Sequence, residues 1–231
     1  MYPLKNSVQD LLRLFYPLLC PVCGNDLMTS ASVICSDCTT TLPHTRFENF
    51  MDNPTEKIFT GRLDVNAAHS EFYFSKGKAI QKLIHQLKYE KKKNVGLMLG
   101  EITAKSIQSS GRFEELDFII PLPMNRNKEI KRGYNQAEVI AIGMSSVLNI
   151  PVVNNVVIKE KNNESQTKKH RAARWANVDG SFVLKDPQTL YRKKILLVDD
   201  VITTGATIDA CGQCLKSASE VSIYVATVAK A

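Results

Sequence analysis

The run from Ile195 to Thr207 constrains the fold of this chain more than any other segment. Four apolar residues, Ile195–Val198, precede Asp199 and Asp200, and a Thr-Thr-Gly-Ala-Thr turn then opens the amphipathic stretch 205–217. A short and wholly apolar run is typical of a strand that is buried on both faces of a sheet. A strand, a polar turn and a helix in this order predict an α/β unit with a ligand beyond the carboxyl end of the strand.

Other parts of the chain repeat this alternation. Short apolar or β-branched segments predict strands at residues 65–75, 117–123, 152–158, 181–184 and 221–228. Apolar residues at helical spacing predict helices at residues 78–87, 95–107 and 134–148. We therefore expect an α/β fold with a mostly parallel sheet flanked by helices. The polar, proline-bearing segment 42–60 has no clear period and is expected to be a linker.

Two adjacent carboxylates at the end of a buried strand repel each other unless a partner holds them. The two hydroxyls of a ribose meet this need, because each of Asp199 and Asp200 can accept a hydroxyl hydrogen bond. A nearby Mg²⁺ would offset the repulsion. The following turn offers threonine hydroxyls, a glycine that lets the backbone come close, and free amides at a helix N-terminus, which together suit a phosphate monoester.

Four of the six cysteines form two Cys-x-x-Cys pairs, Cys20 with Cys23 and Cys35 with Cys38. Two such pairs facing each other give the tetrahedral four-thiolate site that Zn²⁺ prefers in structural positions. Iron is the alternative metal, and two redox pairs are the alternative chemistry. The other two cysteines, Cys211 and Cys214, lie within an expected helix and are interpreted as buried structural residues.

The thirteen residues ILLVDDVITTGAT resemble the phosphoribosyl-pyrophosphate (PRPP) signature of the type I phosphoribosyltransferases. The cysteine pairs, the segment Leu87-Lys88-Tyr89, the run Pro121-Leu122-Pro123 and the segment Arg132–Ala137 precede this signature in the order found in the ComF family. The chain thus resembles ComF proteins, which are associated with competence, from about Cys20 to Ala229. The resemblance implies a phosphoribosyltransferase-like domain at residues 51–231 behind an N-terminal helix and zinc module at residues 1–50.

The resemblance also implies a set of site residues. Asp199, Asp200 and Arg132 are the expected catalytic residues, and Mg²⁺ is expected with PRPP. The residues expected to bind PRPP are the two acids with Thr203, Thr204, Gly205, Ala206 and Thr207. The expected pyrophosphate loop after the strand at 117–123 contains Arg126, Lys131, Arg132 and Gly133. A hood loop within 160–177 is expected to contribute Lys168 and Arg171.

The charge of the chain favours anionic partners. Thirty lysines and arginines against 23 acids give a formal charge of +7, which suits phosphates, nucleotides or nucleic acid, although a solvated basic surface would have the same composition. No apolar run reaches the roughly 20 residues that span a bilayer, and we expect a cytoplasmic protein. The leading hypothesis is phosphoribosyl transfer from PRPP to an unidentified acceptor. The alternative is a non-catalytic PRPP- or nucleotide-sensing protein that handles single- or double-stranded DNA with other competence proteins.

Overall fold

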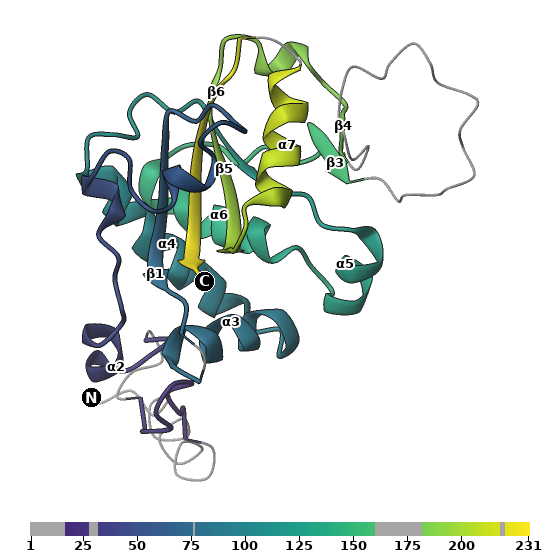
Figure 1. The fold of residues 1–231 in the computed structure, drawn as a ribbon. Coiled ribbons are helices and arrows are strands. Elements are labelled where there is room, and N and C mark those ends of the chain that lie inside the picture. The colour runs from purple at the N-terminus through teal and green to yellow at the C-terminus, as the bar shows by residue number, and fades with distance from the viewer. Residues whose placement is uncertain (1–16, 28–31, 76, 160–181, 218–219) are drawn as a thin grey trace, which may run out of the picture.

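A computed structural model describes residues 17–27, 32–75, 77–159, 182–217 and 220–231. Its centre is a sheet of four parallel strands in the order β1-β6-β5-β2 (Figure 1). The strands are β1 (Ala67–Tyr73), β2 (Phe118–Pro121), β5 (Lys194–Ile202) and β6 (Ser222–Lys230). Val152 adds a single parallel bridge to Ile119 on the outer side of β2. The expected parallel sheet is confirmed.

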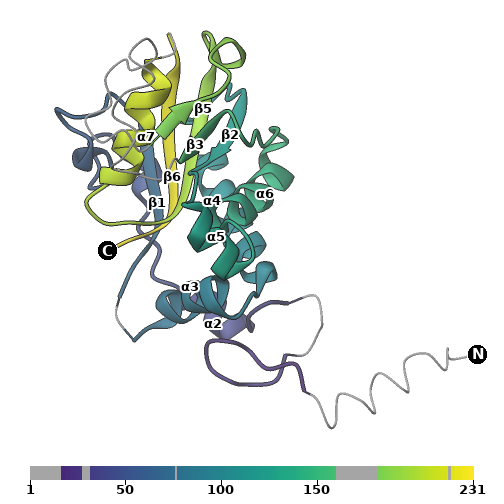
Figure 2. The same ribbon diagram turned by 90° about the vertical axis from the view of Figure 1, so that its right-hand side faces the viewer.

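Helices cover both faces of this sheet (Figure 2). One face carries α4 (Lys93–Ser109) and α6 (Gln136–Leu148), and the other carries α7 (Ala206–Lys216). The side chains of β5 alternate accordingly. Leu196 and Val198 pack in the core beside α4 and α6, whereas Ile195 and Leu197 pack in the core beside α7. Burial on both faces explains why this strand has no polar residue before Asp199.

Two glycines bring α4 and α6 into backbone contact. A β-carbon on Gly100 would lie 2.1 Å from the carbonyl oxygen of Ile140, and one on Gly143 would lie 2.2 Å from that of Leu97. Any larger side chain at either position would force the helices apart, because a backbone carbonyl cannot move aside alone. The two helices therefore form a close-packed layer behind the sheet.

Smaller elements extend the carboxyl-end side of the sheet, at the bottom of Figure 1. They are α2 (Ser36–Thr40), α3 (Ala79–Tyr89) and α5 (Arg126–Arg132). The antiparallel hairpin of β3 (Val157–Lys159) and β4 (Phe182–Leu184) forms a separate two-stranded sheet. Short 3₁₀ turns occupy Phe47–Asn49, Glu56–Ile58 and Gln188–Leu190. No helix in the described part of the chain is long and apolar enough to cross a membrane.

Several local expectations were wrong. The strand before the acids does not end at Val198, because β5 continues its pairing with β6 through Ile202 and includes both aspartates. Much of the expected loop after β2 is the helix α5. The segment 42–60 is not a free linker, since Asn53 is buried and its side-chain amide donates to the carbonyl oxygens of Phe47, Phe50 and Ala68.

Candidate functional site

The acid pair lies on the last part of β5, and a lysine from another element contacts it. Asp200 is 8% exposed, and its two carboxylate oxygens lie 2.9 and 2.8 Å from the ammonium nitrogen of Lys88 at the end of α3. Asp199 is half-buried, and its Oδ1 accepts a hydrogen bond of 2.8 Å from the backbone N–H of Asp200. The structure thus supplies a cation for the pair that sequence reasoning did not place in the site.

The electrostatics of the pair are unequal. Burial and the neighbouring charge of Asp200 raise the pKa of Asp199 from 3.8 to about 7. The hydrogen bond from the amide of Asp200 and the positive charges of Lys88 and Lys159 act in the opposite direction but are weaker. A carboxyl group with such a pKa changes its charge near neutral pH. A ligand that donates hydroxyl hydrogen bonds to it would favour the ionised form.

The Thr-Thr-Gly turn joins β5 to α7 in a conformation that only glycine adopts without strain. Gly205 has a φ of +71°, and a β-carbon there would lie 2.4 Å from Cγ2 of Ile58. The first hydrogen bond of the helix runs from Asp209 N to Gly205 O, so the amides of residues 206–208 are outside the helical ladder. Thr203 and Thr204 are exposed beside them. This turn has the geometry of an anion-binding helix N-terminus.

A remote arginine holds this turn in place. Arg62 donates from Nη1 to the carbonyl oxygen of Thr204 at 2.9 Å and from Nε to Oδ2 of Asp209 at 3.0 Å. Arg62 belongs to the segment that leads into β1, and it lies 142 residues from Thr204 in the sequence. No sequence signal marked this residue, because its role depends on a contact between distant segments.

The cations predicted to bind pyrophosphate lie on α5 and at its end. Arg126 and Lys131 are exposed, whereas Arg132 is half-buried. The guanidinium of Arg132 donates to Oε1 of Gln136 at 2.6 Å and lies 5.6 Å from the ring centre of Tyr89. Gly133 ends the helix with a φ of +84°. In the described residues, Lys88 rather than a cation of α5 contacts the acid pair.

The last residues of α3 join these parts. Leu87 is fully buried, and its carbonyl oxygen accepts a hydrogen bond from the hydroxyl of Tyr134, just after α5. Lys88 contacts Asp200, and Tyr89 lies beneath the guanidinium of Arg132. Each residue of the Leu87-Lys88-Tyr89 segment therefore has a separate contact. The signal for Lys88 was present in the sequence only as part of the family resemblance.

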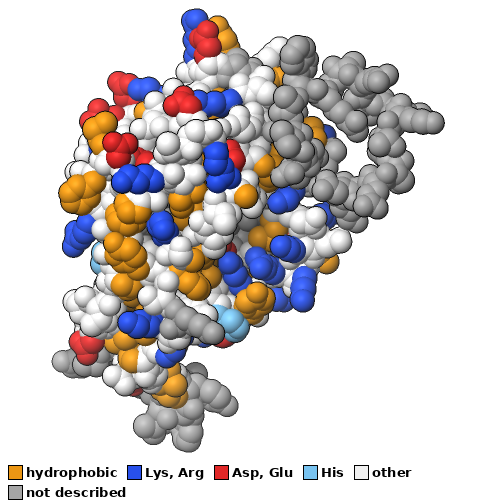
Figure 3. Space-filling model, viewed as in Figure 1, with side chains coloured by type: hydrophobic (Ala, Val, Ile, Leu, Met, Phe, Trp, Pro, Cys, Tyr) orange, Lys and Arg blue, Asp and Glu red, His pale blue; other side chains and the backbone are white. Residues whose placement is uncertain are grey.

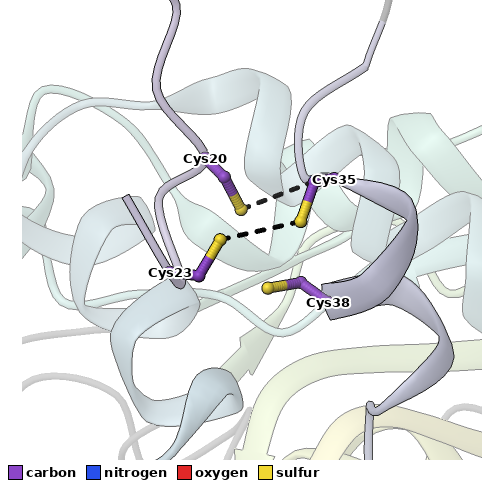
Figure 4. Close-up of side chains that lie close together, drawn as sticks. All are labelled: Cys20, Cys23, Cys35 and Cys38. Atoms are coloured by element: carbon purple, nitrogen blue, oxygen red, sulfur yellow. Dashed lines mark hydrogen bonds between the residues drawn. The ribbon is translucent and has the colours of Figure 1, made fainter. Parts of the chain in front are cut away.

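The four N-terminal cysteines come together as expected (Figure 4). The sulfur atoms of Cys20, Cys23, Cys35 and Cys38 all lie within 4.8 Å of one another, so this donor set could hold a metal ion. The backbone N–H of Cys35 points at the Cys20 sulfur at 3.4 Å. Burial raises the pKa of the Cys20 thiol, but hydrogen bonds from the backbone amides of Cys23 and Cys35 outweigh this and lower the pKa to about 6. A thiol with a low pKa is suited to bind metal as thiolate.

Two expected contributors lie outside the described residues. These are Lys168 and Arg171 of the expected hood loop. The loop would connect β3 to β4, and Lys159 at the end of β3 is close enough to lower the pKa of Asp199.

Comparison with known proteins places the chain among competence proteins. It is 29% identical to competence protein F of Haemophilus influenzae over 153 residues, which are 64% of this chain and 67% of that protein. It is 25% identical to competence protein ComFC of Bacillus subtilis over 197 residues, 85% and 71% of the two chains. The resemblance to the ComF family is confirmed. DNA utilization protein YhgH of Shigella flexneri is 26% identical over 136 residues, and the chain spans 59% of its length. No protein-family model matches this ComF relative.

Solved structures with partial similarity include phosphoribosyltransferases. An adenine phosphoribosyltransferase shares 16% identity at a TM-score of 0.41, over 63% of this chain and 75% of that chain. The glutamine PRPP amidotransferase of Bacillus subtilis shares 19% identity at a TM-score of 0.43, over 62% and 30% of the two chains.

Proposed function

We propose that this chain binds PRPP with Mg²⁺ at the carboxyl end of β5 and transfers the phosphoribosyl group to an unidentified acceptor. The observation that carries this proposal is the position of the acid pair directly before a glycine turn and a helix N-terminus. One strand thereby offers acceptors for sugar hydroxyls next to donors for a phosphate. Such sites at the ends of parallel strands are the usual ligand sites of α/β sheets.

Each part of the site has a role in this proposal. Asp199 and Asp200 accept hydrogen bonds from the ribose hydroxyls. The hydroxyls and amides of the turn bind the 5-phosphate, and Gly205 lets the ligand approach the backbone. The residues of the turn are Thr203, Thr204, Gly205, Ala206 and Thr207.

The cations on and after α5 would bind the leaving group. Arg126, Lys131, Arg132 and the backbone at Gly133 face the developing charge as the bond from C1 to pyrophosphate breaks and its electrons pass to the pyrophosphate oxygen. The acceptor's lone pair forms the new bond to C1. Bound Mg²⁺ would supply further positive charge for pyrophosphate. We propose that Lys168 and Arg171 complete the closed site.

Calorimetry with PRPP, ribose 5-phosphate and pyrophosphate in the presence of Mg²⁺ tests the assignment. Asp200→Ala should weaken ribose 5-phosphate binding about ten- to a hundredfold, because a hydrogen bond to a charged group contributes about 1.5–3 kcal/mol. Thr204→Val should weaken it less, since the backbone amides remain. Asp64→Ala, which removes an exposed carboxylate, is the control. A wild-type protein that binds none of the three ligands would exclude a phosphoribosyl site.

Turnover needs a separate measurement. Pyrophosphate release from PRPP should be followed with a panel of bases, amines and nucleic-acid fragments as acceptors. Release that depends on one acceptor class supports transfer. If PRPP binds but no acceptor yields pyrophosphate, a non-catalytic PRPP- or nucleotide-sensing protein becomes the better account.

Nucleic-acid binding is a second candidate function, favoured by an aromatic surface among cations. Tyr89 is 60% exposed and lies 4.9 Å from the ring centre of His85. Lysine and arginine side chains gather over α5 and the end of α3 (Figure 3), where residues 91–93 are all lysine. Stacking on an exposed ring beside cations is a common way to bind single-stranded nucleic acid. Relatives are named for competence and DNA utilization, and we propose DNA as a partner, with competence proteins.

Salt dependence tests this second function. Affinity for single-stranded DNA should fall steeply as salt rises, because phosphate contacts release counterions. Tyr89→Ala should weaken binding about fivefold or more, whereas Tyr191→Ala, at another exposed tyrosine, should not. Binding that is absent at low salt, or equal in the two variants, would refute this surface.

For the four-cysteine site we propose structural Zn²⁺. Four thiolates leave no open position for substrate, and a small module gains much of its folding energy from the metal. Metal analysis should find about one zinc per chain, and Cys38→Ser should lose it. Residues 1–50 remain our proposed zinc-binding unit and residues 51–231 the sugar-phosphate domain. Six free cysteines suit a reducing compartment, and we propose the cytoplasm.

A further inference from the structure

The helix α3 touches both the four-cysteine module and the acid pair. On one face, Lys82 donates from its ammonium group to the carbonyl oxygen of Val22 at 2.9 Å. Gln86, one helical turn further on, donates from its side-chain amide to the carbonyl oxygen of Pro21 at 3.2 Å. Pro21 and Val22 are the two residues between Cys20 and Cys23. The first cysteine turn is therefore bonded directly to α3.

These contacts lie close to the residue that reaches the sugar site. Gln86 and Lys88 are two positions apart, or about 3 Å along a helix axis. Gln86 is 9% exposed and Leu87 between them is fully buried, so this turn has little room to move independently. The module's apolar residues add to the attachment, since Cys20 and Cys38 pack in the same core as Leu83 and Leu87. A displacement of the cysteine turn would thus be passed to Lys88.

We propose that the four-cysteine module is a positioning element for Lys88 and that, through this lysine, it sets the affinity of the acid pair for ribose hydroxyls. The inference rests on the proposed sugar-phosphate function. Lys88 is its effector because its ammonium nitrogen contacts both oxygens of Asp200. This contact holds the carboxylate in one orientation and offsets the repulsion between Asp199 and Asp200.

The size of the required displacement is small. The ammonium lies 2.8 Å from Oδ2 of Asp200, and a shift of about 1 Å would take it out of hydrogen-bonding range. The pair would then lose a charge-assisted contact. We expect ribose 5-phosphate binding to weaken about three- to tenfold when α3 is released from the cysteine turn.

The test leaves the cysteines and the acids unchanged. The double variant Lys82→Met with Gln86→Leu removes both hydrogen bonds to the cysteine turn but retains side-chain volume. In the full-length protein it should weaken ribose 5-phosphate binding about three- to tenfold, measured by calorimetry, and leave pyrophosphate binding as it is. Removal of metal with a chelator should have the same effect. Lys88→Met should weaken ribose 5-phosphate binding by at least as much, and Lys88→Arg should restore part of it.

A variant cycle separates positioning from general damage. In the Lys88→Met background, neither the double change at Lys82 and Gln86 nor the chelator should weaken ribose 5-phosphate binding further. Effects that add fully in that background would overturn the inference, as would an unchanged affinity in the double variant. A wild-type protein that binds no ribose 5-phosphate overturns the proposed function itself. Thermal unfolding of residues common to all variants checks that the sheet remains folded.

Discussion

Replacing Asp199 with asparagine should make the protein more stable at pH 8, although it removes a residue of the proposed sugar site. The reason is the environment at the end of β5, where burial and the charge of Asp200 raise the pKa of Asp199 to about 7. Keeping this carboxylate ionised in the folded chain therefore costs free energy. Asparagine carries no charge, and its side-chain oxygen can still accept the N–H of Asp200, which Asp199 accepts at 2.8 Å.

The pH window follows from the two pKa values of this group. Below its ordinary value of 3.8, Asp199 is protonated in the folded and the unfolded chain, and the raised pKa has no effect on unfolding. Between pH 3.8 and about 7 the unfolded chain loses the proton while the folded chain keeps it. The free energy of unfolding then falls by about 1.4 kcal/mol per pH unit. Over the whole window the loss is on the order of 4 kcal/mol.

Urea unfolding followed by circular dichroism from pH 4 to pH 8.5 measures this effect. The difference in unfolding free energy between Asp199→Asn and wild type should be near zero at pH 4 and should grow to a few kcal/mol at pH 8. Asp117→Asn is the matched control with the opposite sign. Hydrogen bonds from Lys193 and from the backbone of Lys194 lower the pKa of Asp117, so this variant should be less stable than wild type at neutral pH, and the deficit should shrink as pH falls below about 4.

The reasoning about Asp199 fails if its variant shows the same difference from wild type at every pH. It also fails if the variant is less stable at pH 8. If the prediction holds, the acid pair is kept at a cost in stability, which is common for residues that serve a ligand site.

Three further outcomes can be measured directly. Gly100→Ala should lower the free energy of unfolding by about 3 kcal/mol or more, because its β-carbon would meet the carbonyl oxygen of Ile140 at 2.1 Å; Ser109→Ala on the same helix should change it by less than about 0.5 kcal/mol. Arg62→Met should weaken ribose 5-phosphate binding about threefold to tenfold by loosening Thr204, whereas Lys216→Met, which joins the same two segments elsewhere, should leave it unchanged. Glu71→Gln should destabilise the chain by roughly 3 kcal/mol in urea unfolding at pH 7, since the buried carboxylate contacts His69 at 2.8 Å and His44 at 2.5 Å.

The regular elements could be predicted because their periods are strong. Apolar residues at helical spacing located α3, α4, α6 and α7 to within a few residues, and the apolar runs located the strands. The failures have physical reasons. Charges at Asp199 and Asp200 read as a strand end, but the ladder to β6 supports two more turns of the pleat. Seven residues are too few to show a helical period, so α5 was expected as a loop.

Contacts across long sequence separations could not be predicted. Arg62 reaches Thr204, and Lys88 reaches Asp200 across 112 residues. A lone basic residue gives no sign of which acid it will meet, because that depends on how distant segments pack. Asn53 shows the same limit within the expected linker, where a polar residue is buried by hydrogen bonds that only the folded chain provides. The cysteine cluster could be predicted because its ligand spacing is local.

The order of the strands also bears on how this chain can be assembled. The early strand β1 pairs within the main sheet with β6 alone, and β6 is the last strand in chain order. During synthesis β1 therefore has no sheet partner until the residues of β6 have left the ribosome. Such pairing between distant segments slows folding. A chain cut before Ser222 would lose the strand that joins the early segments, including the support for Arg62, to β5.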